Sequence, residues 1–256
     1  MFGLNEHRIS AQQKAQTLAT ILNDYLITEM ILKNLFTFLF SLLPSLLFGQ
    51  DTLEVISKID KDLNENNYTI SDVLTDTGLM YLHSIALFRE VIKKKAKAEE
   101  IKIAAPNEPG VRIIVNGMMT NKSGKPLPNI LIYFYHTSDK GWYSDTAVHI
   151  LKYEGDHRHA RLFGYVKTDK QGKFKIYTIR PNGYPRSDLA AHIHIQMWKE
   201  DGIPLLGIAG ELQFADDVRM TEARRKKSTE EGFLIANNMG SKEKPVYNYV
   251  IASKVE

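Results

Sequence analysis

Two histidines separated by one residue are the most chemically informative pattern in the sequence. His192 and His194 stand in the run 191–195, AHIHI, whose β-branched residues predict a strand. Residues i and i+2 of a strand point to the same face, so the two imidazoles should lie side by side while Ile193 enters the core. Two adjacent imidazoles form half of a metal site. Taken alone, however, the pair is more typical of a strand without a metal.

Two tyrosines upstream could complete such a site. Tyr184 stands between Gly183 and Pro185, where the proline ring restricts the backbone, and Tyr143 follows a run that predicts a strand. A single tyrosine is more often a packing residue with a hydrogen-bonded hydroxyl. The chain contains no cysteine, which excludes disulfides, thiolate zinc sites, iron–sulfur clusters and a catalytic thiol. Any metal must therefore be held by histidine, tyrosine or carboxylate.

The order of these residues resembles the intradiol ring-cleavage dioxygenases, the family of catechol and protocatechuate 3,4-type enzymes. Tyr143 falls in the family's G-x-Y motif, Tyr184 in its P-x-x-Y-P motif, and the histidine pair in its R-P-A-H-I-H motif. The opening hairpin, the T-D-x-x-G hairpin and the Q-L-Y-F-x-x-D motif are similar to residues 117–128, 164–181 and 211–217. The resemblance covers about residues 100–217.

The resemblance implies a mainly β fold, a β-sandwich of the intradiol dioxygenase type, around one iron. Tyr143, Tyr184, His192 and His194 would be the ligands of Fe(III). Phenolates stabilise ferric iron, and the metal lowers the phenol pKa from its ordinary value of about 10. The implied substrates are a small aromatic diol and O₂, and the implied product is a muconate-type diacid. Tyr184 would leave the iron when the diol binds and take up one of its protons.

The sequence departs from the family at positions near the histidine pair. The family's arginine, which offsets charge on the substrate ring, falls on Leu189, and its glutamine falls on Glu211. We therefore expect another arginine to supply the positive charge, and Arg186 is the nearest in sequence. Arg158 and Arg161 are the alternatives. Tyr184, Arg186 and Glu211 are the expected catalytic residues.

The elements that must position these residues are short strands preceded by a helical region. Apolar residues at helical spacing predict a helix over 78–100, and a proline- and glycine-rich linker follows at 104–110. A helix-prone charged segment occupies 217–231. Strands are expected at 111–115, 130–135, 164–168, 174–179, 191–198, 207–214 and 247–253, with 164–179 forming a hairpin. We thus expect an N-terminal helical region and linker over 50–105 and a β-sandwich catalytic domain over 106–256.

The composition is that of an ordinary globular protein. Of 256 residues, 43% are hydrophobic and 25% charged, which argues against general disorder. Lys and Arg number 33 against 30 Asp and Glu, for a net charge of +3. So small an excess argues against strong binding of nucleic acid.

Residues 30–49 resemble a secretory signal peptide. Lys33 precedes an apolar run over 35–48, which is too short to span a bilayer comfortably and is interrupted by Pro44. Cleavage near Gly49–Gln50 would place the protein outside the cytoplasm, as a periplasmic or secreted protein, with residues 1–29 as an N-terminal extension. A buried core helix is the alternative interpretation.

Two other functions remain open at this point. One is a non-catalytic β-sandwich module that retains only the fold. The other is a zinc site made by His192, His194 and a carboxylate such as Glu211. Oligomers vary within the family, so a homo-oligomer is compatible with the sequence but is not specified by it.

Overall fold

The computed structural model describes residues 27, 30, 51–144, 160–205 and 210–253. The chain divides into two units, Met1–Val55 and Ile56–Glu256. Residues 51–64 are helical. Within the described residues, no helix combines the length and the apolar character needed to cross a membrane. Everything that follows concerns the second unit.

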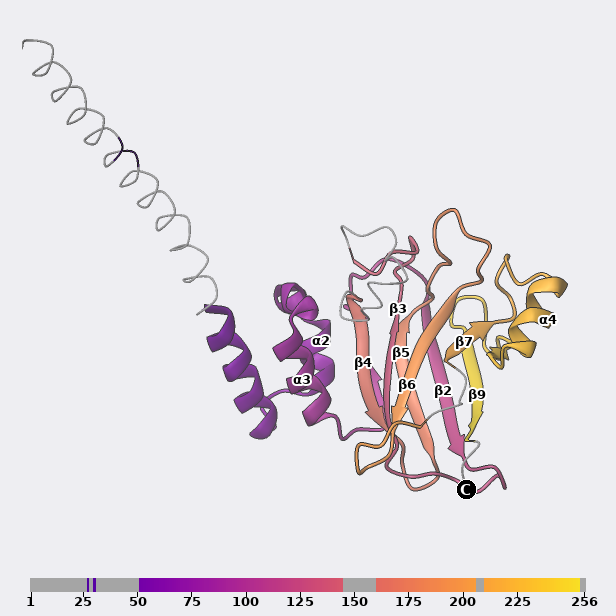
Figure 1. Ribbon diagram of the computed structural model, residues 1–256, viewed down its shortest axis with the longest axis horizontal. Coiled ribbons are helices and arrows are strands. Elements are labelled where there is room, and N and C mark those ends of the chain that lie inside the picture. Colours follow the sequence, from indigo (N-terminus) through magenta and orange to yellow (C-terminus); the bar gives the residue numbers. More distant parts are fainter. Residues whose placement is uncertain (1–26, 28–29, 31–50, 145–159, 206–209, 254–256) are drawn as a thin grey trace, which may run out of the picture. The chain divides into compact units, whose positions relative to one another are not determined.

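Two β-sheets form the body of this unit (Figure 1). The four-stranded sheet has the order β1-β5-β2-β9, and the five-stranded sheet has the order β4-β3-β6-β7-β8. The expected mainly β fold is therefore confirmed. The strands are β1 (Glu100–Lys102), β2 (Arg112–Thr120), β3 (Leu131–His136), β4 (Leu162–Lys167), β5 (Lys173–Ile179), β6 (His192–Trp198), β7 (Glu211–Phe214), β8 (Leu234–Ala236) and β9 (Val246–Ala252).

Alternation of side chains along the strands builds the core and presents the histidines on the opposite face. In β6, Ile193 and Ile195 are buried, with 0% and 4% of their surface exposed. Since successive residues of a strand point to opposite faces, His192 and His194 occupy the other face, as the sequence predicted. The short strands β1 and β8 carry too few residues to show such an alternation, and the sequence analysis missed both.

The predicted hairpin over 164–179 is wrong, because its two strands belong to different sheets. The turn itself forms, since Asp169 N–H donates to Lys173 O at 2.9 Å and Gly172 adopts φ +72°. Beyond the turn, β4 pairs with β3 while β5 pairs with β1 and β2. The residues of the turn favour a reversal of chain direction, but β4 and β5 each pair with strands distant in the sequence, and so they belong to different sheets.

The predicted helix over 78–100 is also divided. A 3₁₀ helix η1 (Thr77–Ser84) begins where Asp76 accepts from Gly78 N–H at 2.8 Å. Ile85 then adopts extended backbone (φ −86°, ψ 122°), and α3 (Ala86–Lys95) follows. The break moves Tyr81 off the predicted apolar face, leaving it 55% exposed.

Three helices contact strands of the two sheets, α3 and α4 (Glu222–Glu230) those of the five-stranded sheet and α2 (Ile70–Thr75) the strand β1 of the four-stranded sheet. Helix α3 lies next to β4 (Figure 1) and buries Phe88 and Ile92 completely. Helix α2 is capped by Thr69, whose side chain accepts from Asp72 N–H at 3.1 Å. Helix α4 lies within the segment predicted to be helical and contacts β8.

Several predictions from the sequence concern residues outside the described ranges. The signal peptide over 30–49, except for Met30, and the extension over 1–29, except for Ile27, lie outside these ranges. Arg158 and residues 207–209 of an expected strand also lie outside them. These predictions stand as they were made. Helices α2 to α4, η1 and both sheets fall within the second unit, Ile56–Glu256.

Two buried histidines predict how stability responds to acid. Burial lowers the pKa of His83 and of His136 to about 4, whereas an unfolded histidine takes up a proton near 6.5. Below pH 6.5 the unfolded state thus binds more protons than the folded state, and stability falls with pH. We expect each histidine to cost about 2 kcal/mol of unfolding free energy by pH 5.

Denaturant unfolding between pH 7.5 and 5 measures this effect. His83→Phe should reduce the loss of stability by about half. Phenylalanine keeps an aromatic ring where His83 stacks on Phe88 (5.5 Å between centroids), but it has no group that takes up a proton. A variant with the same pH dependence as the parent protein would contradict the assignment.

Candidate metal centre

Strand β6 brings the two histidine side chains together. The Nε2 atoms of His192 and His194 lie 3.0 Å apart, and the rings meet edge to face with centroids 4.5 Å apart. His192 is buried, with 6% of its surface exposed. The H-x-H pattern therefore produces the convergence of imidazoles that the sequence predicted.

The two tyrosines come from separate loops and meet at the same point. Tyr143 lies in the loop after β3, and Tyr184 lies in the loop between β5 and β6. Their hydroxyls are hydrogen-bonded to each other. The Tyr184 hydroxyl is 3.1 Å from Nε2 of both His192 and His194, and the Tyr143 hydroxyl is 2.8 Å from Nε2 of His194.

The four donor atoms fit a single metal ion. Metal bonds of about 2.1 Å to nitrogen and oxygen place tetrahedral ligand atoms about 3.4 Å apart, close to the spacing seen here. The tautomer of His192 also fits, because Ala190 O lies 2.8 Å from Nδ1. A carbonyl only accepts hydrogen bonds, so Nδ1 carries the proton and the Nε2 lone pair faces the cluster.

Electrostatics keep both phenols neutral unless a cation is present. Burial raises the pKa of Tyr143 far above its usual value, and the neighbouring Tyr184 raises it further. Burial also raises the pKa of Tyr184 to about 12. Because a bound cation acts in the opposite direction, deprotonation of this pair depends on the metal.

His194 is enclosed from both neighbouring strands. Tyr135 of β3 and Glu211 of β7 are its register partners. The Tyr135 ring stacks on the imidazole with centroids 4.7 Å apart. Glu211 Oε1 lies 3.9 Å from Nδ1, on the side of the ring away from Nε2. Gln213, opposite His192, donates to Glu211 Oε2 at 2.8 Å.

A second combination of ligands shares the same histidines. Among the described residues, His192, His194 and Glu211 can each offer one ligand atom, with all three atoms within 4.8 Å of one another. The structure thus brings together both the tyrosine set and the carboxylate proposed from the sequence.

Of the arginines proposed from the sequence, Arg161 is paired with a carboxylate and Arg186 is exposed on a loop. Arg161 is engaged elsewhere, since its guanidinium pairs with both carboxylate oxygens of Glu108. Arg186 is exposed on the loop that carries Tyr184 and adopts φ +59°. Leu189, at the position of the family arginine, is 37% exposed.

Sequence analysis missed two residues that surround the histidines. Tyr135 was expected only as part of a strand, and Gln213 only as part of a motif. Alternation within β3 and β7 places each on one face, but their contact with β6 follows from strand register. A single sequence does not reveal which strands are neighbours.

Comparison with known proteins connects this site to one family. The family model Dioxygenase_C, described as Dioxygenase, matches residues 87–213. Catechol 1,2-dioxygenase from Acinetobacter baylyi (strain ATCC 33305 / BD413 / ADP1) is 31% identical over 75 residues, which is 29% of this chain and 22% of that protein. Catechol 1,2-dioxygenase 1 from Acinetobacter lwoffii is 30% identical over 79 residues, 31% of this chain and 24% of that protein. The matches thus span less than a quarter of the length of these curated relatives.

Solved structures give matches of lower identity. The dioxygenase domain of a dioxygenase carbohydrate-binding protein fusion from Streptomyces sp. SirexAA-E is 20% identical, with a TM-score of 0.45, covering 63% of this chain and 90% of that one. Catechol 1,2-dioxygenase from Acinetobacter sp. ADP1 is 16% identical, with a TM-score of 0.41, covering 78% and 84%. The matched family model and the two curated relatives support an intradiol ring-cleavage dioxygenase family for this chain.

Proposed function

We propose that the protein is an Fe(III)-dependent intradiol dioxygenase, which cleaves a catechol-type ring between its two hydroxyls with O₂ to give a muconate-type diacid. The observation that carries the proposal is the convergence of Tyr143, Tyr184, His192 and His194, whose donor atoms lie within about 3 Å of their neighbours. The family match supports the same chemistry.

The donor set favours ferric iron over softer or divalent ions. Two phenolates and two imidazoles provide hard oxygen donors and negative charge. Burial makes both phenols poor acids by themselves, so a highly charged cation is needed to hold them as phenolates. When bound, Fe(III) would draw electron density from the chelated diol and make its ring reactive towards O₂.

The two tyrosines differ in their freedom to move. Tyr143 is buried, with 7% of its surface exposed, whereas Tyr184 is only partly buried. Tyr184 can therefore swing towards solvent and take a proton from an arriving diol on its Oη atom, while Tyr143 keeps its place. His194 is held by the Tyr135 ring and by the charge of Glu211.

A zinc site is the second candidate, supported by the grouping of His192, His194 and Glu211. The direction of the carboxylate favours the first candidate. Glu211 faces Nδ1 of His194, but Nε2 is the atom that lies beside Nε2 of His192. The carboxylate is therefore placed behind the imidazole, where it can orient a ligand and compensate charge.

Metal analysis and a visible spectrum test the proposal. Protein produced with ample iron should contain one iron per chain and show a tyrosinate-to-iron absorption band that changes when catechol is added. Oxygen consumption and a new diacid absorption should follow. A colourless protein that contains zinc would favour the second candidate, and a protein without metal would favour a non-catalytic module.

Arg186 is proposed to offset the negative charge that develops on the bound ring, in place of the family arginine lost at Leu189. Because Arg186 is exposed, solvent screens its field, and an exposed charge contributes roughly 1 kcal/mol. Arg186→Ala should accordingly lower turnover about fivefold and leave the iron spectrum unchanged. Arg225→Ala, another exposed arginine, is the control. Equal turnover in both variants would remove Arg186 from the mechanism.

We also propose that the protein is exported by the segment 30–49. The basis is the apolar run behind Lys33. Mass spectrometry of protein recovered outside the cytoplasm should find a new N-terminus near Gln50. Recovery of the active protein in the cytoplasm with residues 1–29 attached would contradict export.

A further inference from the structure

Asn182 lies two residues before Tyr184 and makes contacts with the loop that carries Tyr143. We propose that Asn182 is a positioning residue that fixes the two tyrosine loops relative to each other and so sets the spacing of the two phenol oxygens. The inference rests on the proposed function, because it assigns Asn182 a role in holding the metal ligands.

Three hydrogen bonds join Asn182 to the loop of Tyr143. The Asn182 backbone N–H donates to Ser138 O at 3.1 Å, and the Thr137 hydroxyl donates to Asn182 O at 2.6 Å. The side-chain amide donates from Nδ2 to Asp139 O at 3.1 Å. Main chain and side chain of one residue thus hold three consecutive residues of the other loop.

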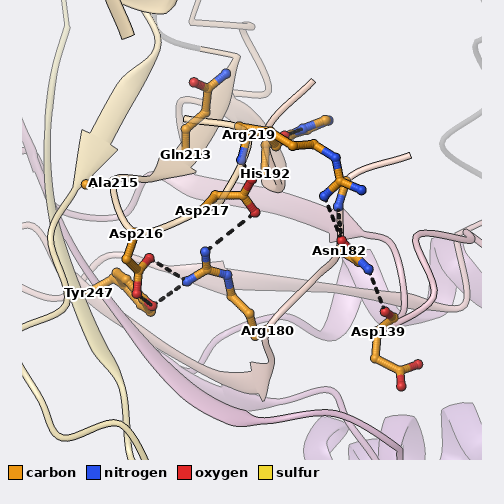
Figure 2. A network of polar contacts seen from close by, with 12 residues as sticks. Asp139, Arg180, Asn182, His192, Gln213, Ala215, Asp216, Asp217, Arg219 and Tyr247 are labelled. Atoms are coloured by element: carbon orange, nitrogen blue, oxygen red, sulfur yellow. Dashed lines mark hydrogen bonds and ion pairs between the residues drawn. The ribbon is translucent and has the colours of Figure 1, made fainter. Parts of the chain in front are cut away.

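The remaining side-chain atom of Asn182 connects to a third segment. Its Oδ1 accepts from Gly183 N–H and from Arg219 Nη1, both at 2.9 Å. Arg219 lies in the turn between β7 and α4, where its backbone N–H donates to Asp217 Oδ1 at 2.9 Å. Figure 2 shows this line of contacts from Asp139 through Asn182 and Arg219 to Asp217.

Arg180 ties the same turn to the body of the unit. Its Nη1 lies 2.9 Å from Asp216 Oδ1, and its guanidinium covers the Phe214 ring at 3.9 Å from the centroid. Asp216 also accepts from the Tyr247 hydroxyl at 2.9 Å (Figure 2). Asn182 therefore anchors the Tyr143 loop to a framework that includes β7 and β9.

The two loops also meet backbone to backbone. A Cβ atom on Gly141 would lie 2.3 Å from Gly183 O, and Gly141 adopts φ +79°. Contact this close leaves no room for a side chain at position 141, so this approach of the two loops requires glycine there. Asn182 hydrogen-bonds both sides of this contact.

The position of each phenol oxygen depends strongly on the conformation of the loop that carries the tyrosine. The oxygen lies at the far end of a long side chain, so a small shift of the backbone moves it substantially. Metal affinity falls when ligands depart from their positions by a fraction of an ångström. If the loops are fixed by Asn182, release of Tyr184 requires only rotation of its side chain, and the Tyr143 loop stays in place. Loss of the side-chain amide removes the bonds to Asp139 O and Arg219 but keeps the two backbone bonds to Ser138 and Thr137. The loops stay in contact but can shift relative to each other, and the spacing of the two oxygens changes.

Removal of the amide tests the inference. Asn182→Ala should weaken iron binding between tenfold and 100-fold, as is typical of residues that orient metal ligands, measured by competition with a chelator. The tyrosinate-to-iron band should shift and broaden, a spectroscopic change that a loss of global stability alone would not produce. Asn182→Asp keeps the Oδ1 acceptor for Arg219 but loses the donor to Asp139 O, so its effect should be intermediate.

Asn116→Ala is the matched control, because it removes an amide that bonds Asn248 at 2.8 Å on the four-stranded sheet. It should leave the band and iron affinity unchanged. If the parent protein shows the band and both Asn182 variants retain its position and the iron affinity, the inference is overturned. If Asn182→Ala does not fold, Asn182→Asp and Arg219→Lys decide the question by the same band. Absence of the band in the parent protein would instead overturn the proposed function.

Discussion

Tyr143→Phe is expected to lower the affinity for iron by more than about 100-fold, beyond the range typical of residues that only orient ligands. The variant loses a phenolate from a buried position 2.8 Å from His194 Nε2, and phenylalanine offers no ligand atom to replace it. Any iron that remains should lack most of the visible band. Titration with ferric chelates and absorption spectra measure both effects.

Tyr177→Phe is the control for this variant. It removes the hydroxyl that donates to Glu100 Oε2 at 3.1 Å on the four-stranded sheet, and it should bind iron as the parent protein does. Parental iron content and colour in Tyr143→Phe would show that Tyr143 is not a ligand.

Glu211→Gln is expected to weaken iron binding about tenfold to 100-fold. Ferric iron with two phenolates retains one uncompensated positive charge, and the partly buried Glu211 carboxylate lies near it, 3.9 Å from His194 Nδ1. Glutamine keeps the shape of the side chain and can still accept from Gln213. The charge is therefore the main property removed.

Two measurements separate charge from structure in this case. The reduction potential of the iron should rise in Glu211→Gln, because loss of a negative charge favours Fe(II). Glu100→Gln, which removes an exposed carboxylate paired with Lys175, should leave the potential unchanged. An unaltered potential and affinity in Glu211→Gln would place this carboxylate outside the electrostatics of the centre.

Local patterns in the sequence were sufficient for much of the site. Strand alternation placed His192 and His194 on one face, and the structure confirms it. The meeting of Tyr143 and Tyr184 with them was an expectation from family resemblance, because loops separated by 41 residues carry no periodicity that predicts contact. Their roles as ligands remain predictions.

Contacts between different strands and between different loops could be predicted less well from the sequence. The separation of β4 and β5 into two sheets depends on partners elsewhere in the chain, although the turn between them was read correctly. The break at Ile85 is a single extended residue between η1 and α3, which the helical spacing of apolar residues does not reveal. Asn182 offers no signal in the sequence beyond its place before Tyr184, since its bonds go mostly to backbone atoms of another loop.

The parallel pairing of β2 with β9 has a consequence for how the protein is made. Met118 of β2 is in register with Val250 of β9, so the four-stranded sheet cannot be completed until residues 246–252 have left the ribosome. All five strands of the other sheet, which carries the histidines, lie between residues 131 and 236. During synthesis, one edge of β2 therefore remains unpaired, and exposed strand edges recruit other chains. Translation that stops before residue 246 should yield a nascent protein whose histidine sheet can form but which depends on chaperones to avoid aggregation.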